Sequence, residues 1–258
     1  MRILLIGGFA LLLATPAAAQ KPVPKSTQKP VQKKAAKLDR GYVSVGGGAH
    51  AVSGTFTDRF TYTVNAENAT AEARYPRKSG VLFDAGGGLR FWKTAGAAVH
   101  ISRSSISGTA HTDSLIPHPF VDDRDRPVAG DAGDLTRTET AAHVQLYYER
   151  DFRRWRVRLA AGPSYFDVQQ EVVTGVNVSE EYPYDIATFR SATTQRGNGS
   201  GAGFNAGADI AWMFSRRLGA GALVRFARAS VDVNVNGTRR VSTDAGGAQA
   251  AAGVRVSF

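Results

Sequence analysis

From Gly41 onward, apolar and polar residues alternate with a period of two, and this pattern constrains the fold more than any other feature of the chain. Such alternation is typical of half-buried β-strands, and the 3.6-residue periodicity of amphipathic helices is almost missing. Eight segments show the alternation: about 41–52, 80–91, 95–107, 139–151, 155–172, 201–213, 218–233 and 246–258. The pattern predicts an all-β chain with eight strands.

The connections between these segments alternate in length. Three are short, at 92–94, 152–154 and 214–217, and four are long, at about 53–79, 108–138, 173–200 and 234–245. Short turns at one end of a sheet and long loops at the other are typical of bacterial outer-membrane barrels. The sequence therefore predicts an eight-stranded antiparallel transmembrane β-barrel over residues 41–258, with the long segments as loops.

The predicted strands have one apolar face and one face of small or charged residues. A soluble barrel would place the apolar face inside, but the aromatic residues favour a lipid-facing exterior because they fall at two levels. One level lies beside the short turns, at Phe91, Tyr148, Trp155, Trp212 and Phe258, and the other lies eight to ten residues away, at Phe83, Tyr165, Phe204 and Phe226. At about 3.3 Å per residue and about 40° of tilt, the two levels are roughly 20–25 Å apart. This spacing predicts an aromatic girdle at each edge of a membrane.

The last residues, Val254, Val256 and Phe258, alternate and end on an aromatic side chain, which resembles the signal read by the outer-membrane assembly machinery. Glycine-rich strand openings occur at 45–48 and 85–88. Together these features resemble the small eight-stranded outer-membrane barrels, a porin-like family that includes the transmembrane domain of outer membrane protein A and the opacity-type proteins. The resemblance covers about 41–258, and departs from the family in its basic extension before the barrel and in having no peptidoglycan-binding domain after it.

The resemblance implies a location and a set of partners. The barrel is expected as a monomer in the outer membrane of a Gram-negative bacterium, with both barrel termini periplasmic and the long loops extracellular. Its expected partners are outer-membrane lipid, lipopolysaccharide and the assembly machinery. The sequence does not specify an extracellular ligand.

The first 40 residues predict export. Residues 1–19 combine a basic start, an apolar run from Ile3 to Ala14 and small residues at 17–19, which is the pattern of a signal peptide. Residues 20–40 hold seven basic residues, one acidic residue and three prolines, and predict a disordered basic periplasmic linker. This linker, either a solvated spacer or a contact for an anionic partner, carries +6 of the net charge of +10, and Arg2 adds one, so +3 remains for 41–258.

Composition excludes several function classes. The chain has no cysteine, which excludes disulfides and cysteine-ligated zinc or iron–sulfur sites. Secretion makes nucleic acid an unsuitable partner for the positive charge. The aspartate-rich segment around Asp123 and Asp125 lacks the glycine and the terminal glutamate of an EF-hand loop. No metal, cofactor or catalytic residue is therefore expected.

Charged residues on the non-apolar face are expected to point into the barrel. They are Asp84, Arg90, Glu149, Arg156, Arg158, Asp209, Arg225 and Arg255. Eight strands enclose a lumen just wide enough for side chains, and buried charges are costly unless paired. The sequence predicts a salt-bridged plug in the lumen, with a gated pore as the alternative.

Three functions remain open from the sequence. The first is a non-enzymatic barrel with a structural or surface-interaction role through its extracellular loops, in which Tyr182, Tyr184 and Phe189 could form a recognition surface. The second is a narrow pore for small solutes. The third is a lipid A-modifying enzyme, because His100 and Ser102 have the His-x-Ser spacing of outer-membrane lipid A deacylases. Arg103 stands where that family has asparagine, and both residues are expected to point inward, so the protein is expected not to be an enzyme.

Overall fold

The computed structural model describes residues 40–258 except 53 and 238. The predicted signal peptide and residues 20–39 of the predicted linker lie outside the described residues. Within these residues, no helix is long and apolar enough to cross a membrane.

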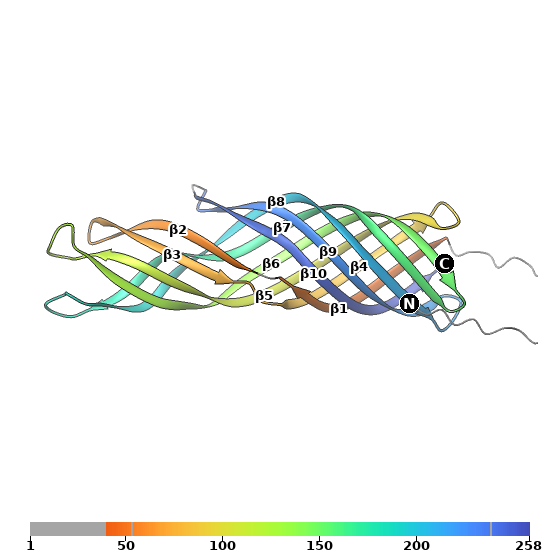
Figure 1. Cartoon of the computed structure of the whole chain (residues 1–258), viewed down its shortest axis with the longest axis horizontal. Coiled ribbons are helices and arrows are strands. Elements are labelled where there is room, and N and C mark those ends of the chain that lie inside the picture. The colour runs from red at the N-terminus through yellow and green to blue at the C-terminus, as the bar shows by residue number, and fades with distance from the viewer. Residues whose placement is uncertain (1–39, 53, 238) are drawn as a thin grey trace, which may run out of the picture. The chain divides into compact units, whose positions relative to one another are not determined.

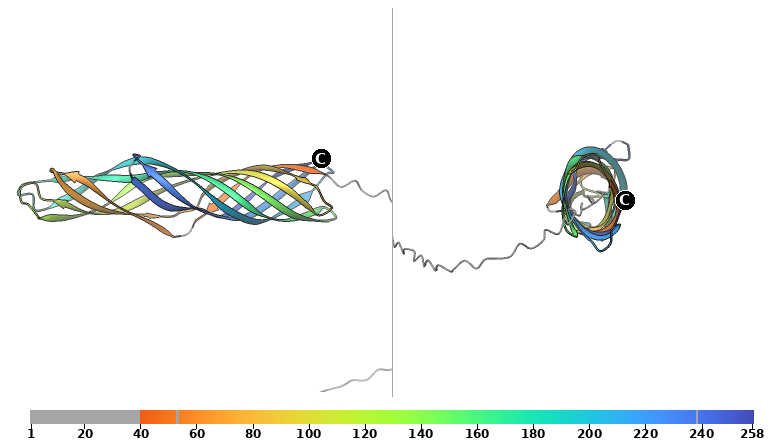
Figure 2. Two further views of the ribbon diagram at one scale, coloured as in Figure 1. Left: turned by 90° about the horizontal axis from the view of Figure 1, so that it is seen from above. Right: turned by 90° about the vertical axis from the view of Figure 1, so that its right-hand side faces the viewer.

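Ten antiparallel strands make up the regular structure of the described residues (Figure 1). They are β1 (Gly41–Ala51), β2 (Thr55–Val64), β3 (Glu67–Pro76), β4 (Gly80–Arg90), β5 (Ala95–Pro117), β6 (Asp125–Phe152), β7 (Trp155–Glu180), β8 (Ala187–Met213), β9 (Leu218–Val235) and β10 (Arg239–Ser257). Eight of them form a ring in the order β1-β4-β5-β6-β7-β8-β9-β10, and β10 pairs with β1 to close it. The end view in Figure 2 shows this ring. The predicted eight-stranded antiparallel barrel is confirmed.

Both ends of the described chain lie at the end of the barrel that carries the short turns (Figure 1). The amide N–H groups of Arg40 and Gly41 donate to the carbonyl oxygen of Phe258, at 2.8 and 3.0 Å. The turn between β6 and β7 is so tight that Phe152 pairs directly with Trp155. The first and last strands therefore meet at one rim.

The prediction of four long loops is wrong. Segment 53–79 contains the β2–β3 hairpin, and the other three segments are continuations of barrel strands. Their connections span only 118–124, 181–186 and 236–238. The reason is that these segments also alternate, but their apolar residues face the inside of the barrel, which is the reverse of the pattern used to predict the strands.

β9 shows the reversal of polarity within a single strand. Its burial alternates without interruption, so the same positions point outward along its length. The outward side chains are apolar up to Phe226 and polar from Arg228 onward, as Ser230, Asp232 and Asn234 follow. The inward side chains change in the opposite sense, from Arg225 to Ala227, Ala229, Val231, Val233 and Val235. The same positions therefore face outward along the whole strand, while the outward face changes from apolar to polar.

The same change divides the whole barrel into two sections. The proximal section, 41–51, 80–102, 141–166, 203–227 and 247–258, has an apolar exterior and a polar lumen. The distal section, 55–79, 103–140, 167–202, 228–237 and 239–246, has a polar exterior around an apolar core. That core contains Phe56, Phe60, Tyr75, Leu135, Val168, Val172, Val231, Val233 and Val235, and Phe166 at the end of the proximal section packs against it. The first section has the polarity typical of a lipid-facing barrel, and the second has the polarity typical of a water-soluble one.

The distal section is held along one seam by side chains instead of a strand ladder. β1 pairs with β10 only as far as Ala51 and Ala248, and β2 pairs with β3. Across the seam Arg239 donates to Asp58 at 3.0 Å, and its guanidinium lies 4.8 Å from the centre of the Phe60 ring. Strand pairing therefore closes the proximal ring fully and the distal ring only in part.

Candidate functional site: the barrel lumen and the section boundary

Residues predicted for the membrane-facing surface lie on the outside of the proximal section. The exposed aromatic side chains include Phe83, Phe91, Tyr148, Trp155, Tyr165, Phe204, Trp212, Phe226 and Phe258. Val254 and Val256, from the predicted assembly signal, lie on the outer face of β10. Between the two aromatic levels the exterior carries aliphatic side chains such as Val99, Val144, Leu159 and Val224.

The predicted lumen charges all point inward, and the first cluster of them lies near the short turns. Glu149 accepts hydrogen bonds from Arg158, at 2.9 Å to Nε, and forms an ion pair with Arg90. The register places Glu149 directly opposite Arg158 on the inward face of β6 and β7. The Arg158 guanidinium also lies over the rings of Tyr42 and Tyr147, at 3.7 and 4.5 Å from their centres. Two cations thus share one carboxylate, and one of them, Arg158, also lies over two aromatic rings.

Arg255 and Arg156 extend this cluster along the rim. Arg255 forms an ion pair with Asp209 at 2.6 Å, and its guanidinium lies 4.8 Å from the centre of the Tyr42 ring. Arg156 donates to the hydroxyl of Ser257 at 2.9 Å. The Tyr42 ring therefore contacts two guanidinium groups, one from β7 and one from β10.

Asp84 is the centre of a second cluster, deeper in the lumen. One of its oxygens lies 2.9 Å from Nδ1 of His100, and the other accepts a hydrogen bond from Arg225 at 2.7 Å. Arg225 also donates to Gln249 at 2.8 Å, and His100 Nε2 lies 3.1 Å from the Tyr42 hydroxyl. Tyr42 thus joins the two clusters, and the eight predicted charges belong to one connected network.

The lumen also contains neutral polar side chains, which the predicted charge network does not include. His143 contacts two hydroxyl groups, that of Ser102 at 3.0 Å and that of Ser164 at 2.8 Å. Gln145 donates to Asn205 at 2.5 Å, and Asn205 donates to Ser164. Each of these residues occupies an inward position of a predicted strand, so the alternation itself could have identified them.

Asn205 also satisfies backbone groups where the β6–β7 ladder is interrupted. Its amide donates to the carbonyl oxygens of Gly162 and Pro163, at 3.0 and 3.1 Å. Pro163 has no N–H to donate, and the ladder breaks beside it without a shift of register. At Gly162 a Cβ would come within 2.0 Å of the Val144 carbonyl oxygen, so only glycine fits.

The His-x-Ser pair does not form a nucleophile–base–acid series. Both side chains point into the lumen and are buried. Asp84 contacts His100, whereas the Ser102 hydroxyl contacts His143 instead. A serine nucleophile needs a base within hydrogen-bond reach and a third group that orients that base. Here the carboxylate contacts one imidazole, that of His100, and the serine hydroxyl contacts another, that of His143.

The lumen is filled by these side chains. A cavity beside Asp84, His100, Asp209 and Arg255 measures about 30 Å³, which is room for about two water molecules. Above it, Arg137 donates to Glu139 at 2.7 Å and to the carbonyl oxygen of Asp244 at 2.7 Å. The apolar distal core begins directly beyond this layer. A solute would have to displace first the ion pairs and then the core.

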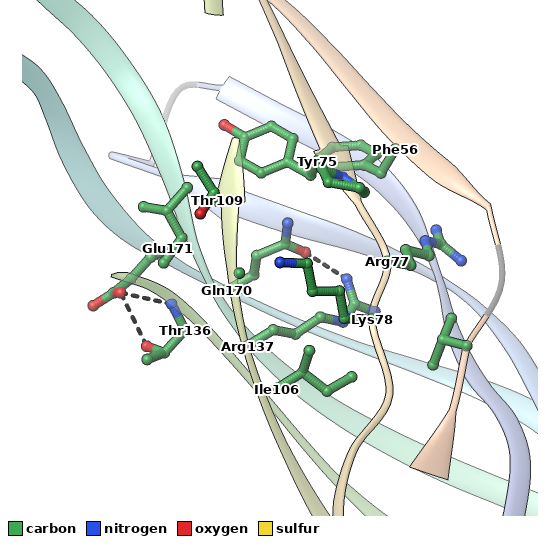
Figure 3. A pocket seen from close by; sticks show the side chains of 14 residues that line it. Phe56, Tyr75, Arg77, Lys78, Ile106, Thr109, Thr136, Arg137, Gln170 and Glu171 are labelled. Carbon is green, nitrogen blue, oxygen red and sulfur yellow. Dashed lines mark hydrogen bonds between the residues drawn. The ribbon is translucent and has the colours of Figure 1, made fainter. Parts of the chain in front are cut away.

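A second cavity, of about 50 Å³, lies at the boundary between the two sections (Figure 3). Its lining combines apolar, basic and other polar side chains from β2, β3, β5, β6, β7 and the connection after β3. Among them are Phe56, Tyr75, Arg77, Lys78, Ile106, Leu135, Arg137, Gln170 and Glu171. Lys78 is exposed, so the cavity has a basic residue at its rim.

The tips of two distal hairpins pack against each other. The Phe120 and Tyr184 rings meet at 5.3 Å between centres, and Arg124 pairs with Asp185 at 2.9 Å. Around this contact four side chains remain exposed and apolar, and we call them the tip patch: Phe120, Val121, Tyr182 and Ile186. Phe189 was predicted with Tyr182 and Tyr184 as a recognition surface. It does not belong to the tip patch, because it is half-buried against a core cluster of the distal section. The sequence thus identified part of the patch and missed its β5–β6 half.

Several acidic residues of the distal section form pairs with basic side chains. Asp131 lies 2.7 Å from Nδ1 of His111, and Asp113 pairs with Arg74 at 3.0 Å. Among the described residues no group of three or more histidine, aspartate or glutamate side chains has the arrangement of a metal site.

Solved structures similar to this chain include three outer-membrane proteins. The outer membrane protein OprG from Pseudomonas aeruginosa is 9% identical with a TM-score of 0.43, and the match covers 85% of this chain and 97% of that one. Neisserial surface protein A is 16% identical with a TM-score of 0.37, over 84% and 97%. The outer membrane protease OmpT from Escherichia coli is 7% identical with a TM-score of 0.45, over 85% and 97%. No protein-family model matches the sequence, and no curated protein does.

The class of protein is defined by the chain's own strand pairing and surface. It is a closed, eight-stranded antiparallel β-barrel with an apolar exterior and a packed, charged lumen in one section, continued by a section of opposite polarity.

Proposed function

We propose that this protein is a non-enzymatic outer-membrane β-barrel that carries an interaction surface away from the membrane on its distal section. The observation that supports the proposal is the reversal of polarity along continuous strands. Outward residues on β9 are apolar from Leu218 to Phe226, and these eight steps span roughly 20 Å at about 3.3 Å per residue and about 40° of tilt. That is close to the apolar thickness that outer-membrane barrels present to lipid.

The distal section has the properties of a rigid spacer. Its ladder β7–β8 continues for more than ten residue pairs beyond the boundary, and its core is buried. A polar exterior of this kind is unfavourable in lipid, where an arginine at mid-depth costs about 2–4 kcal/mol. We therefore infer that the distal section stands in water on the extracellular side, and that the tip patch at its far end is the contact surface.

Cysteine accessibility tests the placement, because the natural chain has no cysteine. Three positions are replaced by cysteine one at a time. Ser230 lies on the outer face of the distal part of β9, Ala222 lies on the same face in the apolar band, and Ser215 lies in a short turn. A membrane-impermeant maleimide is applied to intact cells and to permeabilised cells. We expect labelling of Ser230→Cys on intact cells, of Ser215→Cys only after permeabilisation, and of Ala222→Cys only after denaturation.

The opposite result would refute the orientation. If Ser215→Cys is labelled on intact cells and Ser230→Cys is not, the distal section faces the periplasm. If Ala222→Cys is labelled as fast as Ser230→Cys, the proximal exterior does not face lipid at all.

The tip patch is tested with an apolar probe. Phe120→Ser combined with Tyr182→Ser is expected to reduce the partition of intact, expressing cells into hexadecane, because both side chains are largely exposed. Thr188→Ser, an exposed change on β8, serves as the matched control. Equal partition of all three strains would remove the patch as an exposed apolar surface.

A further inference from the structure

The strand ladder has a gap along one edge of β5, at the boundary between the two sections. β4 pairs with β5 as far as Val81 and Ser105, and β3 pairs with β5 only from Arg74 and His111 onward. Residues 106–110 of β5 thus have no ladder partner on this edge among the described strands. The connection 77–79 runs past the gap, and the cavity of about 50 Å³ opens there.

One side of this cavity is apolar. Phe56 and Tyr75, in contact at 5.2 Å between ring centres, lie on one side of the cavity, and Ile106 lies below them (Figure 3). Leu135 also lines the cavity and belongs to the same core cluster as the two rings. The three core residues are less than one-tenth exposed. This apolar side is continuous with the distal core, so it could pack against a short hydrocarbon segment.

The other side of the cavity carries two cations, Arg77 and Lys78, and its carboxylates form their direct ion pairs with other residues. Arg137 is paired with Glu139, and Glu171 is paired with Arg196 at 3.0 Å. Among the described residues no carboxylate lies within 4.0 Å of the charged nitrogens of Arg77 or Lys78. The Nε of Arg77 is buried without a hydrogen-bond partner, although Nη2 donates to Thr243 at 3.2 Å.

The buried part of the Arg77 side chain is therefore held at an energetic cost, and the exposed Lys78 adds a second cation at the rim of the cavity. Burial, followed by the nearby charge of Arg137, lowers the pKa of the Arg77 guanidinium, and the negative charges of Asp244 and Glu139 offset only part of this lowering. An unpaired, partly buried cation is unfavourable, and a bound anion would offset that cost while accepting the free Nε donor.

The depth of the cavity matches the headgroup layer of a membrane. Lys78 precedes the outward, exposed Val81 by three residues, or roughly 8 Å along the barrel axis at about 3.3 Å per residue and about 40° of tilt. Val81 and Phe83 are the last apolar outward residues of β4 before the distal section. Arg77 and Lys78 thus lie just above the apolar band, where the charged groups of lipids reside.

We propose that this cavity binds a phosphate-bearing amphiphile, with the phosphate on Arg77 and Lys78 and the first part of the hydrocarbon chain on the apolar side chains of Phe56, Tyr75 and Leu135. A neutral amphiphile would leave the two cations unpaired. A free anion would leave the apolar side uncovered. The combination of both features at one site selects the amphiphile.

Binding is measured by isothermal titration calorimetry on the full chain, folded in neutral detergent, with dodecyl phosphate as the probe. The double variant Arg77→Gln and Lys78→Gln is expected to bind about 10-fold more weakly or worse, because charged hydrogen bonds are lost. The matched control, Lys93→Gln with Arg154→Gln, removes two exposed cations at the short turns and is expected to bind as the wild type does. Wild-type binding is also expected to weaken as salt is added.

A second variant fills the cavity and keeps its charges. At Gly108, a lining residue, a Cβ would have the Pro76 carbonyl oxygen as its nearest neighbour, at 4.0 Å. Gly108→Leu is therefore expected to fold and to weaken dodecyl phosphate binding. Gly133→Leu, at a position open to solvent with nothing within 4 Å of its Cβ, is expected to leave binding unchanged.

Three results would overturn the proposal. They are unchanged dodecyl phosphate binding in both cavity variants, equal binding of inorganic phosphate, and equal binding of dodecyl maltoside. Heat-dependent gel mobility identifies folded protein, and if the double charge variant does not fold, Gly108→Leu decides. Because the assay is made in detergent, it is independent of the side of the membrane on which the distal section stands.

Discussion

Neutralising one partner of the buried Asp84–Arg225 pair should destabilise the barrel far more than neutralising an exposed pair. The Arg225 side chain is 0% exposed and that of Asp84 6%, at 2.7 Å from each other. Arg225→Gln leaves the carboxylate with His100 as its remaining side-chain contact, and Asp84→Asn leaves a guanidinium in the lumen without its counter-ion. Breaking a buried pair from one side typically costs about 3–5 kcal/mol.

The double variant Asp84→Asn/Arg225→Gln separates the charge from the contact. Two amides can still hydrogen-bond to each other, to His100 and to Gln249, and no net charge stays buried. We expect it to lie within about 1–2 kcal/mol of the wild type, so that the two single effects are strongly non-additive.

An exposed pair provides the reference. Arg59 and Glu72 are 2.6 Å apart with side chains 80% and 24% exposed, and Arg59→Gln is expected to cost less than about 1 kcal/mol. Stability is measured by urea unfolding in lipid vesicles, using the fluorescence of Trp92, Trp155 and Trp212, which all lie near the short turns. If Arg225→Gln costs no more than Arg59→Gln, or if the single effects add in the double variant, the reasoning about a charge-paired lumen is refuted.

Three further perturbations test the two-section architecture. Phe166→Ala, at a fully buried core position, should lower the free energy of unfolding by about 3–5 kcal/mol in urea titrations followed by gel mobility; a loss below about 1 kcal/mol would contradict the packed core. Val224→Arg should cost about 2–4 kcal/mol in vesicles, whereas Ser230→Arg, on the same face of β9, should stay within about 0.5 kcal/mol; equal costs would refute the reversal. Hydrogen bonds from Thr136 and then Arg196 lower the pKa of Glu171 below 4.5. The ionised Glu171 therefore stabilises the fold above pH 4.5, and this stabilisation is lost as the pH falls through the lowered pKa. Glu171→Gln should reduce the loss of unfolding free energy in acid, and an unchanged loss would contradict the assignment.

The sequence was sufficient for the closed ring because lipid and lumen impose opposite demands on alternate residues of each strand. Residues such as Val144 and Leu159 could be placed outside, and Arg158 and Arg225 inside, from their place in the alternation of each strand alone. The exact partners could not be predicted, because pairing across the lumen depends on the shear of the barrel. Asp84 meets Arg225, 141 residues away, through the closed ring and not through an adjacent ladder.

The boundary cavity was beyond sequence reasoning for a related reason. It exists because β3 and β4 pair with different stretches of β5, and no local pattern specifies that 77–79 bridges the gap. Arg77 and Lys78 look like ordinary loop residues in the sequence. Their lack of carboxylate partners becomes meaningful only when Glu139 and Glu171 are seen to be engaged elsewhere.

The distal section, by contrast, did leave a signal in the sequence, which is a change in the parity of the apolar residues. In 218–226 the larger outward residues, Leu218, Val224 and Phe226, occupy even positions, whereas in 231–235 the valines occupy odd positions. A strand that kept one environment would need a one-residue bulge at this point to hold its apolar face in place. The β9–β10 register runs from Arg239 to Val256 without a shift, so the environment changes instead of the strand. Alternation that inverts its parity without a bulge therefore indicates a strand whose outer face changes from apolar to polar along its length, which is the pattern expected of a strand that continues beyond a membrane.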